Sequence, residues 1–371
     1  MSFGGAALAP SLRPLVQLWR ISMKKTLLAI AALAATSGAF AQSSVTLYGV
    51  VDASVEHIAS TTRVARVSSS NLASSRLGFK GSEDLGSGLR ANFVLEAGLN
   101  VDTGANTGAA ARFFDRSAWA GLQGGFGELR LGRIDSPIGA LAGDTKVLGA
   151  QNYDDLKIAP TRAGNTYRRV DNAITYVLPE FVSGLTAQLQ YSTAVDSVTA
   201  GNGNAETTPG SDVGKAYGLN VKYLAGPFSA GVGYLNAKDE VATAGKQKAN
   251  AALAYAGYDF GVVKLTGYYN AESRPVALGA GDRLTVAGIK VGVPLSTSFL
   301  ITASVAEASN VAAVPTNSDH DDAVISSVKA TYSLSKRTTL YGLFTNVHNE
   351  SSANLGISGG GVTVANGQSA R

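Results

Sequence analysis

The chain has 371 residues and no cysteine, which excludes disulfides, thiolate metal sites and a cysteine nucleophile. Charged residues make up 16% of it, a low share for a soluble globular protein, while its 43 glycines exceed average usage. The net charge of +4 comes from the first 41 residues, which carry four basic residues and no acidic one. The rest of the chain is neutral, so its composition gives no support for nucleic-acid binding.

The N-terminal region predicts export. Residues 23–41, MKKTLLAIAALAATSGAFA, combine two lysines, an apolar run and a small-residue end, which are the three parts of a secretory signal peptide. We expect cleavage between Ala41 and Gln42. The apolar run is shorter than the roughly 18 residues that a membrane-spanning helix needs. Residues 1–22 fit no part of a signal peptide, and we interpret them as a misassigned extension before a true start at Met23.

From residue 45 onward, apolar and polar residues alternate along the chain. The segment 184–193, GLTAQLQYST, and the segment 323–334, AVISSVKATYSL, are typical. A period of two predicts half-buried β-strands. We count fifteen such strands between Val45 and about Val347.

The connections between these strands alternate between short turns and long polar loops. The short turns fall at 84–88, 124–127, 179–184, 225–228, 258–261, 294–298 and 333–338. The long loops fall near 57–74, 100–112, 136–170, 193–215, 236–249, 271–282 and 307–322. This pattern is typical of an outer-membrane barrel with short periplasmic turns and long outer loops, and a soluble β-sandwich has no reason to show it. The sequence therefore predicts an all-β fold, a transmembrane antiparallel up-and-down β-barrel in residues 42–371.

Two further features agree with a barrel. Phenylalanines follow the short turns with the parity of the apolar strand face, as expected for an aromatic girdle; they are Phe181, Phe228 and Phe299. Bacterial single-chain barrels have an even number of strands, whereas the chain after Val347 has the composition of a loop. We therefore expect that a last strand is missing from this sequence and would follow Arg371.

Three long segments identify a family. The segments SSVTLYGVVDASVE (43–56), SRLGFKGSEDLGSGLRANFVLEAGLN (75–100) and FFDRSAWAGLQGGFGELRLGR (113–133) resemble the first five strands of Gram-negative general porins of the β-proteobacterial type. The resemblance implies a sixteen-stranded, homotrimeric barrel among the lipid and lipopolysaccharide of the outer membrane. It implies a water-filled channel for ions and small hydrophilic solutes, without a cofactor. The chain departs from the family at its C-terminus, where members end on a strand with a terminal aromatic residue.

The resemblance also indicates where the pore narrows. Residues 137–167 resemble the third outer loop, which folds inward, and its acids are candidates for one side of the constriction: Asp144, Asp154 and Asp155. Wall arginines are expected opposite, at Arg116, Arg133 and Arg168. Arg76 has the parity opposite to Leu77 and should face the lumen, because a lipid-facing arginine costs roughly 2–4 kcal/mol at mid-membrane. Tyr48 and Lys80 are further candidates for the pore lining. The basic candidates outnumber the acidic ones, which predicts a mild preference for anions.

Other interpretations stay open at this point. Each loop acid is alternatively a solvated surface charge. The run around Asp319–Asp322 either binds divalent cations that bridge lipopolysaccharide or is solvated. A substrate-specific channel needs an aromatic path, for which Tyr48, Tyr268 and Tyr269 are too scattered, and a loop-borne adhesin is a further alternative.

A hydrolase is the alternative of another class. GISGG at 356–360 matches the pattern around a serine nucleophile, Ser358, but that chemistry needs a strand before the serine and a helix after it. The three histidines have no evident serine and aspartate partners or metal-ligand spacing; they are His57, His320 and His348. We expect no enzymatic activity and no metal site.

Overall fold

The computed structural model describes residues 44–108, 112–145, 152–159, 161, 167–195, 209, 212–241, 245–273, 283–311, 320–357 and 362–371. The predicted signal peptide and the extension before it lie outside these residues. In the described part of the chain, no helix is long and apolar enough to cross a membrane.

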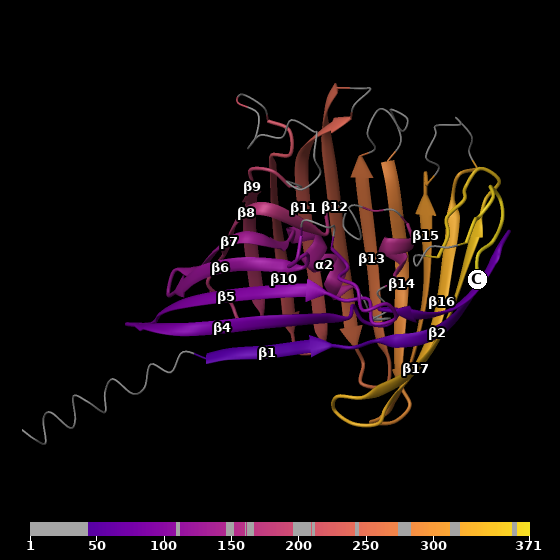
Figure 1. Cartoon of the computed structure of the whole chain (residues 1–371), viewed down its shortest axis with the longest axis horizontal. Helices are drawn as coiled ribbons and strands as arrows, with labels where there is room; N and C mark the ends of the chain where they lie inside the picture. Colours follow the sequence, from indigo (N-terminus) through magenta and orange to yellow (C-terminus); the bar gives the residue numbers. More distant parts are fainter. Residues whose placement is uncertain are drawn as a thin grey trace, which may run out of the picture.

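Fifteen strands of the described residues form one antiparallel sheet, and from β4 onward each strand pairs with the next along the chain. They are β1 (Ser44–Val50), β4 (Arg76–Gly86), β5 (Leu89–Gly98), β6 (Ser117–Gly124), β7 (Gly127–Asp135), β8 (Arg169–Val177), β9 (Leu185–Ser192), β10 (Ala216–Ala225), β11 (Phe228–Val241), β12 (Gly245–Asp259), β13 (Lys264–Ser273), β14 (Arg283–Pro294), β15 (Phe299–Ser309), β16 (Ala323–Ser333) and β17 (Thr339–Asn349). The predicted all-β, up-and-down fold is confirmed. The sheet curls, and Figure 1 shows β4–β7 at a large angle to β11–β16.

A separate hairpin departs from the prediction. Residues 57–74 were expected to form a loop, but β2 (Ala53–Ala59) and β3 (Arg63–Ser69) form a two-stranded sheet. Ala59 pairs with Arg63, so the turn between the strands is short. The charged residues Arg63 and Arg66 interrupt the apolar pattern in this segment, which is why period two did not reveal it.

The sheet has an apolar outer face and a polar inner face. Along β14, Ile289 is 57% exposed whereas the neighbouring Lys290 is buried, and along β15 the exposed Val305 follows the buried Ser304. This is the arrangement of a barrel with lipid outside and a polar interior. Two of the phenylalanines expected in an aromatic girdle contact a tyrosine: the rings of Phe228 and Tyr223 lie 6.1 Å apart, and those of Phe299 and Tyr332 lie 6.4 Å apart.

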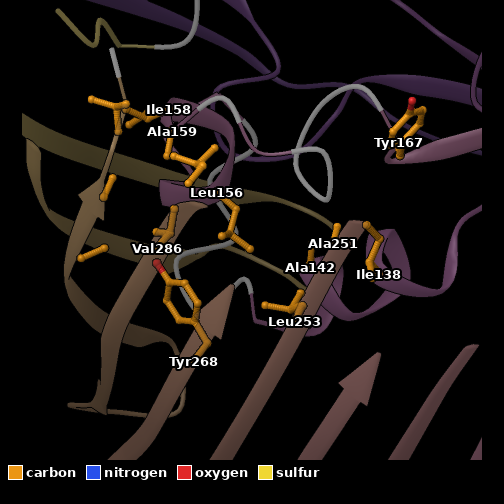
Figure 2. Close-up of a cluster of buried hydrophobic side chains, with 14 of the residues drawn as sticks. Ile138, Ala142, Leu156, Ile158, Ala159, Tyr167, Ala251, Leu253, Tyr268 and Val286 are labelled. Carbon is orange, nitrogen blue, oxygen red and sulfur yellow. The ribbon is translucent and has the colours of Figure 1, made fainter. Parts of the chain in front are cut away.

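Two short helices line the inner face. Helix α2 (Pro137–Asp144) contacts β10, β11 and β12, and α3 (Asp155–Ile158) follows in the same loop. Figure 2 shows Ala142 of α2 beside Leu253 of β12, Ile138 of α2 near Ala251 of β12, and Leu156 of α3 near Val286 of β14. Part of the buried hydrophobic cluster therefore lies between the inward-folded loop and the wall.

The last two residues of the chain lie between β17 and β2. The N–H and carbonyl groups of Ala370 bond to Val347 at 3.0 and 2.8 Å, and those of Arg371 bond to Ala59 at 2.9 and 2.7 Å. A cavity of about 590 Å³ continues from there between β2 and β17. The strand expected beyond Arg371 stays a prediction.

Candidate functional site

The inward-folded loop begins and ends at one point on the wall. Ser136 is the N-cap of α2: its hydroxyl accepts from the Gly139 N–H and donates to the Tyr167 carbonyl at 2.5 Å. Its own N–H donates to the carbonyl of Arg168 at 3.1 Å. Serine at the N-cap followed by Pro137 at the first helical position favours a helix start here. The two ends of the loop are thus tied together beside β7 and β8.

Glycines on β11 form the seat of α2. A Cβ atom on Gly231 or Gly233 would lie 2.8 or 2.6 Å from the methyl carbons of Leu141, so a larger residue at either position would force the Leu141 side chain to move. From β10, Asn220 donates to the carbonyl of Pro137 at 2.8 Å. Sequence reasoning missed this seat, although glycine inside a strand pattern indicates a close approach of backbone.

Three carboxylates on the wall organise six arginines. The first, Glu96 of β5, receives Arg116 Nε at 2.6 Å, and Arg76 Nε lies 3.4 Å from it. The Tyr48 hydroxyl donates to the same carboxylate at 3.0 Å. Lys80 lies with its ammonium group 5.6 Å from the centre of the Tyr48 ring. The structure therefore brings four of the predicted wall residues together around one acid.

The second carboxylate, Asp171 of β8, receives Arg133 and Arg112, each at 2.5 Å. The pairing of β7 with β8 shifts register after Gly132, which has a φ of +135°. A bulge re-aims the side chain next to it, and here that side chain is Arg133. Arg112 was not predicted. It lies in an irregular segment before β6, where the alternation of a strand cannot predict which way a side chain points.

The third carboxylate is Asp135, which lies 3.0 Å from Arg169 and 3.9 Å from Arg168. Nε and Nη1 of Arg168 are buried and have no hydrogen-bond partner among the described residues. Among the described residues, six arginines thus pair with these three carboxylates, so the arginines outnumber their carboxylate partners.

Lys157 of α3 adds a seventh cation. Burial lowers the pKa of its ammonium group below the usual range; Asp154 opposes this effect, while Arg169, Arg168 and Arg116 strengthen it. Like charges destabilise the protonated form of a lysine, so these arginines add to the effect of burial. Lys157 also borders a cavity of about 690 Å³.

Two of the three candidate acids of the loop are buried against the wall. Asp154 and Asp155 are 1% and 0% exposed and face Lys290 on the wall, so neither presents its charge to the lumen. Only Asp144 is partly exposed, and it lies 3.2 Å from Lys222 of β10. The alternation that predicts the facing of strand residues does not apply to acids in a loop, and Lys290 is distant in sequence. The sequence therefore gave no signal that Asp154 and Asp155 contact Lys290.

A comparison with known families identifies the protein. A family model described as a Gram-negative porin matches residues 29–352. The chain belongs to this family. It is 32% identical, over 92% of its length and 94% of the relative's, to outer membrane porin protein 32 of Delftia acidovorans. It is an outer-membrane porin with the fold and localisation that its sequence predicted.

Two solved structures are informative for the porin. An anion-selective porin from Comamonas acidovorans superposes with a TM-score of 0.70 at 26% identity, covering 89% of this chain and 97% of that one. The trimer form of OmpT from Vibrio cholerae has a TM-score of 0.53 at 15% identity, covers 88% of this chain and 97% of its own, and is similar in fold alone.

The remaining candidates have structural partners or lie outside the described residues. Ser358 and Asp319 are not among the described residues. Asp322 accepts from the N–H of Asn310 at 3.0 Å and from the Ser309 hydroxyl at 3.2 Å, so it holds the connection between β15 and β16. Among the described residues, no group of three or more histidine, cysteine, aspartate or glutamate side chains is placed to hold a metal ion.

Proposed function

We propose that the porin conducts small hydrophilic solutes and prefers anions. The observation that carries this proposal is the sharing of three carboxylates by six arginines on the wall where the inward-folded loop begins and ends. Charged rings at a constriction select ions by sign, and low-dielectric walls strengthen their field. The burial of Asp154 and Asp155 supports the preference, because it removes two negative charges from the lumen.

The residues proposed for the pore keep the roles inferred from sequence, with two changes: three cations are added and two acids are reassigned. Arg76, Arg116, Arg133 and Arg168 form the basic side of the constriction, joined by Arg112, Arg169 and Lys157. Residues 137–167 are the constriction loop, and Tyr48 and Lys80 line the pore. Asp144 is the acid that the loop offers to the lumen, while Asp154 and Asp155 are assigned to the wall.

Vesicle swelling tests general diffusion. Purified porin is reconstituted into vesicles, and neutral sugars of increasing size, a small organic anion and a cation of equal size are compared. A general, anion-preferring pore gives rates that fall smoothly with size and are higher for the anion. Saturation of the rate, or block of the channel by one solute, would instead favour a substrate-specific channel.

The homotrimer and the absence of catalysis are part of the same proposal. A trimer form is recorded for the similar fold of OmpT, and the porin family and the structural neighbours are channels rather than enzymes. We expect cross-linking in detergent to give a ladder that ends at three subunits. We expect no hydrolysis of ester substrates above that of a vesicle blank.

A further inference from the structure

The N-terminal end of the short helix α3 carries two carboxylates that are buried against Lys290 of β14. The ammonium group of Lys290 lies 3.3 Å from Oδ2 of Asp155 and 3.5 Å from Oδ2 of Asp154. The side chains of all three residues are 0–1% exposed. Asp154 is also the N-cap of α3, since its side chain accepts from the N–H of Leu156 at 3.1 Å.

Two neighbouring strands complete the contact. The hydroxyl of Tyr268 donates to Asp155 at 2.8 Å, and that of Ser304 lies 3.4 Å from the same carboxylate. The Tyr268 ring lies over Gly288, where a Cβ atom would come within 2.6 Å of it, and Figure 2 shows its hydroxyl directed toward α3. We call Asp154, Asp155, Tyr268, Lys290 and Ser304 the α3 anchor.

The α3 anchor differs in kind from a second ion pair that joins the loop to the wall among the described residues. Asp144 and Lys222 join α2 to β10, but their side chains are 35% and 26% exposed, and exposed pairs contribute little. Breaking a buried pair is far more disruptive, because it leaves an uncompensated charge in a low-dielectric site. If α3 moved into the lumen, water would hydrate the uncompensated charge.

We propose that the α3 anchor fixes the constriction loop against β13–β15 and thereby sets the open bore of the pore. Lys290 is a positioning residue in this proposal: its charge is balanced by Asp154 and Asp155 inside the wall, away from the path of solutes. The inference rests on the proposed channel function, since it assigns a bore to the same constriction.

The test compares Lys290→Met with Lys222→Met in the full chain. Both variants remove one positive charge from the inner wall, but only the first breaks the α3 anchor. The chain has no cysteine, so Leu156→Cys on the buried face of α3 supplies a single thiol in each background. A membrane-impermeant methanethiosulfonate reports how often α3 leaves the wall, and planar-bilayer recordings report the voltage at which the channel closes.

We expect Lys290→Met to raise the rate of thiol modification by about a hundredfold and to give a noisier channel that closes at lower voltage. Lys222→Met keeps the slow modification and the closing voltage of the wild type. If Lys290→Met does not fold, Tyr268→Phe removes only one hydroxyl from the anchor and is expected to raise the rate about tenfold.

Equal modification rates and equal closing voltages for Lys290→Met and Lys222→Met would overturn the proposal, as would a wild-type rate of modification for Tyr268→Phe. The thiol assay does not require conduction. A wild-type channel that fails to prefer anions therefore overturns the proposed function and leaves the anchor to be decided by the modification rates.

Discussion

Arg116 is joined to Glu96 twice. Its backbone N–H donates to the carbonyl of Glu96 at 3.1 Å, and its Nε donates to the carboxylate at 2.6 Å. The double link fixes the guanidinium at the start of β6, where the chain emerges from a long outer loop. Glu96 thus fixes the position of Arg116, which lies just before β6 and outside the strand pairing.

Glu96→Gln is expected to strengthen the preference for anions. The change removes a negative charge from between Arg76 and Arg116 while keeping the side-chain shape, so the local excess of positive charge grows. The free energy of unfolding falls by about 1–3 kcal/mol, because two charge-assisted contacts become neutral ones. The measurement is the reversal potential in a potassium chloride gradient. Glu83→Gln is the control, since Glu83 is exposed beside the apolar outer face of β4; an equal shift for both variants would contradict the assignment.

Arg168→Met is expected to weaken the preference for anions. Two nitrogen atoms of Arg168 are buried without hydrogen-bond partners in the described part of the chain, and its carboxylate partner Asp135 lies 3.9 Å away, so its charge is less neutralised than that of Arg116, whose partner lies at 2.6 Å. We expect the chloride-to-potassium permeability ratio to fall by about two- to fivefold. Arg337→Met, at an exposed position in a short turn, should leave the ratio unchanged. A ratio that stays constant for Arg168→Met would remove this residue from the constriction.

Gly139→Ala is expected to destabilise the base of the constriction loop. A Cβ atom on Gly139 would collide with the backbone carbonyl oxygen of Arg168, and a rigid backbone atom cannot move aside as a side chain can. The expected cost is about 1–3 kcal/mol of unfolding free energy, measured as a lower denaturant midpoint for the refolded protein. Gly125→Ala is the matched control, because nothing lies within 4 Å of a Cβ there. Equal midpoints for the two variants would show that the loop base does not need glycine.

The anion preference is expected to fall as the pH rises, and to do so at a lower pH than the one at which an exposed lysine loses its proton. The pKa of Lys157 is lowered by burial and by its arginine neighbours, so the folded porin loses this proton at a lower pH than an exposed lysine would. The positive charge is present below that lowered pKa and lost as pH rises through it. Reversal potentials measured from neutral to alkaline pH follow this change. Lys157→Gln should abolish the decline; a decline that persists in the variant would assign it to another group.

The signal peptide gives a prediction of a simpler kind. Mass spectrometry of porin purified from outer membranes should show a mature chain that begins at Gln42, because a signal peptidase cleaves after the small-residue end at Ala39–Ala41. A mature protein that retains residues 1–22 would contradict both the cleavage site and the interpretation of that extension.

The fold was predictable because one local signal repeats along the chain. Period two and alternating loop lengths are present within each hairpin, so strands such as β9 and β16 needed no knowledge of their partners. The same parity placed Arg76 on the inner face, where Glu96 meets it at 3.4 Å. Where the pattern was interrupted, at Arg63 and Arg66, the β2–β3 hairpin was missed.

The interior of the site was less predictable, because its contacts join distant segments. Asp154 and Asp155 are charged loop residues whose partner, Lys290, lies on a strand far along the chain, and nothing local distinguishes them from solvated acids. The seat of α2 at Gly231 and Gly233 requires knowing that a helix lies there. Arg112 acquires its role only through Asp171 of β8.

The most direct test of the account is the reversal potential of the purified porin in a planar bilayer between concentrated and dilute potassium chloride. Because six arginines share three carboxylates, we expect the reversal potential to have the sign that chloride flow gives. We expect the size of this potential to fall at high salt, where the charges are screened. A potential of the opposite sign, showing that potassium crosses more readily than chloride, would contradict the assignment of the arginine-lined constriction.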